Sequence, residues 1–136
     1  MKINVLECGP RDGWQNLKSL LPIEEKKHII DGLVEAGVSM LEVTSFVSPK
    51  AIPQMADASE LAGYVLTSHP DITTYALVPN YRGVQNSWLA GVRHLTYVIS
   101  VSESHNKANI NRTHEQSFEE LRRIYADFPD ADICVE

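Results

Sequence analysis

Near the start of the chain lies Glu7-Cys8-Gly9-Pro10-Arg11-Asp12-Gly13-Trp14-Gln15-Asn16, directly after the mostly apolar positions 3–6. This order predicts a first strand, beginning at Lys2 or Ile3, that opens into a polar loop, because the glycines and the proline interrupt regular structure. Arg11 and Asp12 then place a cation beside an anion where the strand ends. In α/β folds that edge binds ligands. An isolated Arg-Asp pair is more often a solvated turn, so the functional interpretation depends on the rest of the chain.

The remaining sequence alternates predicted strands and helices. Apolar or β-branched runs predict further strands at residues 38–43, 72–78, 94–101 and, at its start, 132–136. Helical spacing and end signals predict helices from Pro22 to Gly37, Pro53 to about Leu66, about Tyr81 to Ala90, and Thr113 to about Ala126. The last of these helices has capping-box spacing between Thr113 and Gln116. A polar loop is predicted at residues 102–106.

Strict alternation implies parallel strands joined by right-handed crossovers, whose carboxyl ends share one edge. Polar residues at the predicted strand ends should therefore converge there: Arg11, Asp12, Gln15, Glu42, Ser45, Asn80 and Ser102. Glu42 lies in an otherwise apolar strand, where an unpaired carboxylate is costly. It should have a partner such as Arg11, or a proton to transfer. For Gln15, Ser45 and Asn80, lining a pocket and completing loop hydrogen bonds are equally good interpretations.

Two α/β architectures share this pattern, namely a five-stranded flavodoxin-like sheet and the first half of an eightfold barrel, which normally needs about 250 residues. A sequence of 136 residues that stops inside a fifth strand favours the barrel. The expected fold is the N-terminal half of a TIM (β/α)8 barrel, with four βα units and the start of a fifth strand, as one partial domain over residues 1–136. Its first and fifth strands would be open edges, so copies of the chain are expected to associate as a homo-oligomer.

The composition excludes some partners. The net charge of -6 argues against general affinity for nucleic acid or an anionic membrane surface, although a local basic pocket stays open. Two cysteines, Cys8 and Cys134, do not form a secreted disulfide framework. There is no export signal and no apolar run of membrane-spanning length. The expected location is cytoplasmic.

Three segments together resemble the hydroxymethylglutaryl-CoA lyases, members of a metal-dependent superfamily of TIM-barrel lyases and condensing enzymes. The first is residues 7–16, whose Arg-Asp-Gly-x-Gln core is shared across that superfamily. The second runs from Glu42-Val43-Thr44-Ser45-Phe46-Val47-Ser48-Pro49-Lys50 to Pro53-Gln54-Met55-Ala56-Asp57 and is similar to the lyase branch. The third comprises Ser102-Glu103-Ser104-His105-Asn106 with Asn109, Asn111 and Thr113.

The resemblance covers the N-terminal half of a family member. The family's His-x-His metal ligands, further Asn ligand and cysteine-bearing Gly-rich loop belong to the other half, and the five histidines of this sequence have no such spacing. Trp14 departs from the aliphatic residue more usual in the family, which leaves the acyl preference open.

The resemblance implies a retro-Claisen cleavage of 3-hydroxy-3-methylglutaryl-CoA to acetyl-CoA and acetoacetate, with an acyl-CoA substrate and Mg²⁺ or Mn²⁺. The catalytic residues implied are Arg11, Asp12 and Glu42. Asp12 would be the metal ligand, since its carboxylate is a hard oxygen donor. Arg11 would face the developing enolate. The residues implied to bind substrate are Arg11, Gln15, Ser45 and Asn80.

Other functions stay open at this point. A related condensing synthase would run a similar step in the opposite direction, and a non-catalytic half-barrel would only bind ligand or pair with another copy. The sequence has no nucleophile elbow, dinucleotide fingerprint or P-loop. Cys8 is expected to pack as a small buried residue rather than to act as a nucleophile. Lys18, Lys50 and Arg112 are either contacts for CoA phosphates or solvated surface charges.

Overall fold

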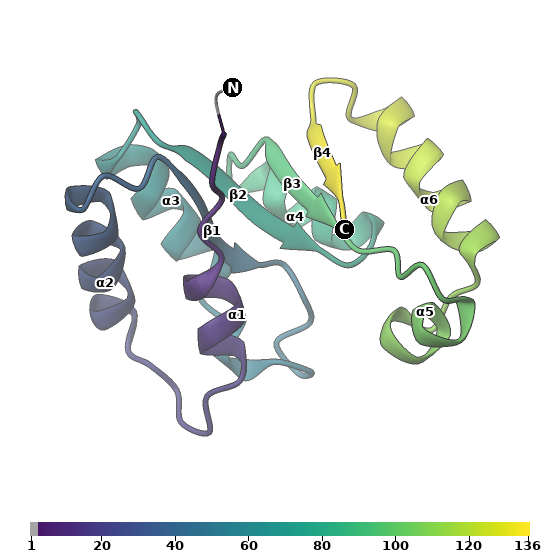
Figure 1. Cartoon of the computed structure of the whole chain (residues 1–136), viewed down its shortest axis with the longest axis horizontal. Helices are drawn as coiled ribbons and strands as arrows, with labels where there is room; N and C mark the ends of the chain where they lie inside the picture. Colours follow the sequence, from purple (N-terminus) through teal and green to yellow (C-terminus); the bar gives the residue numbers. More distant parts are fainter. Residues whose placement is uncertain (1–2) are drawn as a thin grey trace.

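A four-stranded parallel sheet in the order β1-β2-β3-β4 forms the centre of the computed structural model, which describes residues 3–136 (Figure 1). The strands are β1 (Met40–Ser45), β2 (Thr73–Val78), β3 (His94–Tyr97) and β4 (Asp132–Val135). The connecting helices are α2 (Ile23–Glu35), α3 (Ala58–Ser68), α4 (Tyr81–Leu89) and α6 (His114–Asp127). Parallel pairing of every neighbouring strand puts all the carboxyl ends at one edge, as predicted.

The connecting helices pack on one face of the sheet, where two apolar clusters form the core. The first joins β2 and β3 to α4 and α6 and includes Ala76, Val78, Leu95, Val84 and Ile124. The second joins β1 to α2 and α3 and includes Leu41, Val43, Ile30, Leu61 and Val65. Along β2 buried residues alternate with half-buried ones, so only one face of that strand is fully covered.

The local signals located most elements correctly. Helix α2 begins directly after Pro22, and helix α4 begins after Asn80, whose side chain accepts a hydrogen bond from the Gly83 amide at 2.9 Å. Helix α6 carries the predicted capping box between Thr113 and Gln116. The predicted fifth strand is β4. That residues 1–136 form a single partial domain stays a prediction.

The predicted first strand at residues 3–6 does not form. Only Glu7 pairs with its neighbour, through a single parallel bridge to Leu41. Ile3 and Val5 are 71% and 73% exposed, so no packed face supports a strand at these positions. Lys2, the alternative start of this strand, lies outside the described residues.

The predicted loop after it is a short helix, α1 (Gly9–Gln15). Pro10 lies in its first turn, where the missing N–H costs no hydrogen bond. The Asp12 amide donates to the Cys8 carbonyl at 2.8 Å, which closes that turn. A proline that was interpreted as a breaker therefore starts a helix.

Two further boundaries differ from the prediction. Strand β3 ends at Tyr97 rather than Val101, and residues 102–106 begin helix α5 (Glu103–Ile110) with Ser102 as its N-cap. The helix predicted from Pro53 is divided into a 3-10 turn, η1 (Pro53–Met55), and α3. The division occurs where Asp57 and the Gln54 carbonyl bind the Lys26 ammonium group at 2.8 and 2.6 Å.

Candidate active site

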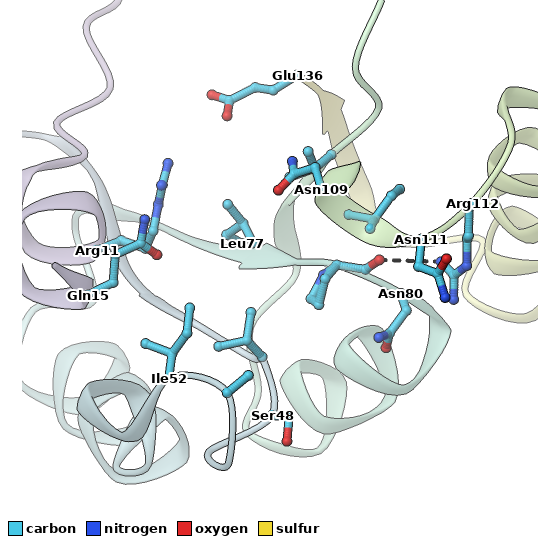
Figure 2. Close-up of a pocket in the computed structure, with 15 residues that line it drawn as sticks. Arg11, Gln15, Ser48, Ile52, Leu77, Asn80, Asn109, Asn111, Arg112 and Glu136 are labelled. Carbon is cyan, nitrogen blue, oxygen red and sulfur yellow. Dashed lines mark hydrogen bonds between the residues drawn. The ribbon is translucent and has the colours of Figure 1, made fainter. Parts of the chain in front are cut away.

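A cavity of about 630 Å³ lies at the carboxyl edge of the sheet (Figure 2). Helix α1 lines one side with Arg11 and Gln15, and the end of α5 and the residues after it line the other with Asn111 and Arg112. Leu77 of β2 lies between them. The cavity therefore occupies the position where parallel α/β sheets bind ligands.

Arg11 and Glu42 form the most buried ion pair of this edge. The Arg11 Nε donates to Glu42 Oε2 at 2.5 Å, and the two side chains are 11% and 0% exposed. Burial alone lowers the pKa of Arg11, but the hydrogen bond and charge of Glu42 outweigh it and raise that pKa. The guanidinium group thus stays charged. Glu42 lies in the middle of β1 rather than at its end, a position that the predicted strand end did not give.

The second oxygen of Glu42, Oε1, is buried and accepts no hydrogen bond from any described residue. A buried carboxylate oxygen without a donor is costly, and such groups concentrate at functional sites. Glu42 therefore presents a free acceptor beside the Arg11 guanidinium. The predicted pair of Arg11 and Glu42 is confirmed as a contact.

Asp12 extends this pair toward solvent. Its Oδ1 accepts from Arg11 Nη1 at 3.0 Å and from Gln15 Nε2 at 3.2 Å, and its side chain is 63% exposed. Helix α1 makes this arrangement because residues three apart lie on the same helical face. Gln15, Asp12, Arg11 and Glu42 form one connected row, which we call the charge cluster.

The other predicted site residues lie outside this cluster. The Ser45 side chain is buried, and its hydroxyl donates to the Leu77 carbonyl at 3.3 Å. Asn80 lines the cavity but also caps α4. Ser102 caps α5. A hydrogen bond between strands and two helix caps account for these contacts, and the assignment of Ser45 and Asn80 as substrate-binding residues stays a prediction.

The described residues provide only part of a possible metal site. Among residues 3–136, no three His, Cys, Asp or Glu side chains lie together in a way that could hold an ion. Asp12 keeps Oδ2 free of hydrogen bonds to the described residues, and this exposed carboxylate oxygen suits Mg²⁺ or Mn²⁺. The donor chemistry therefore fits one ligand of such an ion, and the described residues do not complete a site.

Cys8 lies beside the charge cluster and is not activated by it. Burial, followed by the negative charge of Glu42, raises the pKa of the Cys8 thiol from 9.0 to about 11. The charge of Arg11 acts in the opposite direction but is the weaker influence. A protonated thiol is a poor nucleophile, as expected, but Cys8 is half-buried rather than the fully buried residue that the sequence predicted.

Part of the cavity lining was not predicted from the sequence. Ser48 and Ile52, in the connection after β1, line the cavity, as does Glu136 after β4. Arg112, for which a phosphate contact and a solvated charge were both open, lines it as well. Asn111 has a φ of 54°, and this left-handed residue turns the chain out of α5 toward Arg112. Asn at a helix C-terminus is the one sequence signal that indicates this turn.

The fold and the cavity define a partial (β/α)8 barrel with a charge cluster at the carboxyl ends of its strands. The HMGL-like family model matches residues 2–134, and the chain belongs to the HMGL-like family. The mitochondrial hydroxymethylglutaryl-CoA lyase of Macaca fascicularis is 39% identical over 134 residues, which are 98% of this chain and 41% of that protein. The lyase YngG of Bacillus subtilis is 37% identical over 132 residues, or 97% of this chain and 44% of that protein.

Solved structures agree with this family assignment. An HMG-CoA lyase from the bacterium A. baumannii, in complex with coenzyme A and 3-methylmalate, matches with a TM-score of 0.89 and 35% identity over 97% of this chain and 43% of that one. The B. subtilis HMG-CoA lyase matches with a TM-score of 0.87 and 36% identity, and the match covers 98% of this chain and 45% of that protein. The barrel prediction is therefore confirmed over the flavodoxin-like alternative. The chain spans less than half the length of these relatives.

Two further findings concern location. No helix among residues 3–136 is long and apolar enough to cross a bilayer. The relatives include mitochondrial, cytoplasmic and bacterial proteins, so the cytoplasmic location stays a prediction.

Proposed function

We propose that this chain supplies the charge cluster of a metal-dependent carbon-carbon lyase that cleaves 3-hydroxy-3-methylglutaryl-CoA to acetyl-CoA and acetoacetate. The observation that carries the proposal is the buried contact of Arg11 with Glu42 beside the cavity at the carboxyl edge of the sheet. The family and the relatives named hydroxymethylglutaryl-CoA lyase support the reaction class. A neighbour in complex with coenzyme A supports an acyl-CoA ligand.

In this reaction the substrate hydroxyl loses its proton to a base, and its carbon becomes the ketone of acetoacetate. The carbon-carbon bond breaks, its electrons pass to the thioester as an enolate, and protonation of that enolate gives acetyl-CoA. Arg11 suits the enolate oxygen, since its guanidinium donates hydrogen bonds without losing a proton. Glu42 fixes the orientation of that group through Nε. Asp12 accepts from it on the solvent side, and Gln15 in turn donates to Asp12.

Asp12 is the residue that we propose as a metal ligand. A divalent Mg²⁺ or Mn²⁺ ion bound there would stabilise the alkoxide form of the substrate hydroxyl. Gln15 and Asn80 line the cavity and would contact the acyl group, and Ser45 is proposed as a further substrate-binding residue. Nucleic acid and membrane surfaces remain unexpected partners because of the net charge of -6.

The test is a chimera in which residues 1–136 replace the matching part of the B. subtilis lyase, a relative with a TM-score of 0.87 to this structure. We expect the chimera to form acetoacetate from 3-hydroxy-3-methylglutaryl-CoA with Mg²⁺ or Mn²⁺. Arg11→Gln should lower kcat about 10²–10³-fold, as loss of one preorganised oxyanion donor does elsewhere. A folded chimera without turnover would contradict the proposal, and product from acetyl-CoA plus a 2-oxo acid would indicate the condensing alternative.

Asp12→Asn in the same chimera tests the metal ligand. We expect lower activity and a higher Mn²⁺ concentration for half-maximal rate, because an amide oxygen replaces a charged ligand. Asp71→Asn makes the same charge change at an exposed position and should have little effect. Equal metal dependence in both variants would exclude Asp12 as a ligand.

The absence of a complete metal cluster among the described residues favours a second candidate, a half-barrel without catalysis of its own. We therefore expect purified residues 1–136 to show no measurable lyase turnover, with or without Mn²⁺. Clear turnover from that purified chain would contradict this expectation.

A further inference from the structure

A second arginine, Arg112, lines the cavity from the side opposite Arg11 (Figure 2). It follows the left-handed turn at Asn111 that ends α5. Its side chain is 26% exposed, so it is partly withdrawn from solvent rather than extended into it. The proposed reaction gives this residue no role.

The guanidinium group of Arg112 is held by a chain of contacts that reaches the core. Its Nη1 donates to Glu120 Oε2 of α6 and, at 3.4 Å, to the Pro79 carbonyl. The same Glu120 oxygen accepts from the Tyr97 hydroxyl at 2.9 Å, and Tyr97 is fully buried. A long side chain that is fixed in this way has already lost most of its rotamer freedom, so a ligand would not have to order it.

The contacts leave much of the donor capacity of Arg112 unused. Nε and Nη2 donate to none of residues 3–136, although an arginine carries five N–H donors. An arginine oriented by one carboxylate and presenting free donors to a cavity is suited to planar anionic groups, because its fork matches two oxygens at once. The cavity also has an acidic lining residue, Glu136, which Figure 2 shows apart from Arg112, on the β4 side.

We propose that Arg112, held by Glu120 and Tyr97, is a second anion-binding residue of the cavity and binds a phosphate or carboxylate group of the ligand at the end opposite Arg11. The identity of the ligand as an acyl-CoA rests on the proposed function. The binding of an anion does not.

The test measures binding by calorimetry, with two probes that separate the sources of the anion. Coenzyme A carries phosphates and no acyl carboxylate, and 3-hydroxy-3-methylglutarate carries carboxylates and no phosphate. Arg112→Gln should weaken binding of at least one probe about tenfold, the effect of losing one charge-assisted hydrogen bond. Arg122→Gln makes the same charge change on α6, at an exposed residue without an ion pair among the described residues, and should change binding less than about twofold.

Weakening of coenzyme A alone assigns the phosphate, and weakening of the glutarate alone assigns the acyl carboxylate. Equal effects of Arg112→Gln and Arg122→Gln would show general attraction and overturn the inference. It would also fail if the unaltered protein bound neither probe at millimolar concentration.

A structural role of Arg112 needs separate exclusion, because Arg112→Gln leaves the Glu120 carboxylate without its cation. The double variant Arg112→Gln/Glu120→Gln removes both charges, so thermal stability should recover while probe binding stays weak. Recovery of binding in the double variant would show that Arg112 only neutralises Glu120. Turnover by the chimera is a separate readout. If the chimera is inactive but its binding of the probes still depends on Arg112, the proposed lyase function is wrong and the proposed anion-binding role of Arg112 stands.

Discussion

At the scale of single residues, the site depends on a carboxylate placed where the solvent cannot reach it. Glu42 is 0% exposed and is only half satisfied, since Arg11 binds one of its oxygens and no described residue binds the other. Removal of Arg11 would leave the buried Glu42 charge without compensation, which is more costly than loss of the pair as a whole. Glu42 therefore fixes the Arg11 side chain at the cavity, and loss of Arg11 would destabilise the folded chain.

The same carboxylate, after burial, contributes to the raised pKa of the Cys8 thiol and so to its low reactivity. In a Cys134→Ser background, alkylation of Cys8 by iodoacetamide should be slow at pH 8, where a pKa of about 11 leaves about one thiol in a thousand ionised. The rate should rise up to about pH 11, and folding stability should fall above about pH 9, because the folded state holds the proton more tightly than the unfolded state. Glu42→Gln removes a negative charge and should shift this profile to lower pH. An unchanged profile would show that burial alone sets the Cys8 pKa.

At the scale of elements, the sequence predicted those whose signals are local. The capping box of Thr113 with Gln116 indicated helix α6, and helical spacing indicated α4, whose Asn80 cap was not predicted. Helix α1 could not be predicted in this way, because its glycines and proline are typical of a loop. It is stabilised instead by the burial of Trp14, 7% exposed, whose ring lies 5.6 Å from the Lys26 ammonium group. Such tertiary contacts have no sequence signature.

The same limit applies to the site. Convergence of Arg11, Asp12, Gln15 and Glu42 followed from β-α alternation, because parallel strands share one carboxyl edge. The position of Arg112 in the cavity lining could not be predicted from this alternation. It depends on α5 and on the contact with Glu120, two features that appear only when the chain is folded.

Helix α5 is attached to the molecule through Asn106, whose side chain is 0% exposed. It accepts from the Ser100 amide and donates to the Arg112 carbonyl and to Ser117 Oγ, each at 3.0 Å. Asn106→Ala should lower the free energy of unfolding by about 2–4 kcal/mol, since it leaves buried partners unsatisfied. Asn109→Ala changes an exposed residue of the same helix and should cost less than about 1 kcal/mol. Urea denaturation measures both, and equal losses would show that α5 is not held by this side chain.

At the scale of the whole molecule, the sheet is covered on one face and open at its edges. Glu42, Tyr75, His94 and Asp132 are register neighbours across all four strands, so their side chains share one face. The Tyr75 and His94 rings lie 5.2 Å apart, and His94 contacts Asp132 at 2.8 Å. A polar row of this kind packs poorly against an apolar helix, and the connecting helices lie on the other face (Figure 1).

The open edges lead to a prediction about association. Within residues 3–136, strand β4 pairs only with β3, and residues 3–7 pair only at Glu7. Both edges therefore expose backbone groups beside Val135 (46% exposed) and Val5 (73%). Purified residues 1–136 should therefore form dimers or larger species whose proportion rises with concentration, as sedimentation velocity would show. Val135→Lys and Val5→Lys place a charge at an edge and should reduce association, whereas Leu89→Lys alters an apolar residue, 86% exposed, on α4 and should not. A chain that stayed monomeric at every concentration would contradict edge pairing. Equal effects of all three lysine variants would instead indicate association through general surface hydrophobicity, since the charge would then act wherever it is placed.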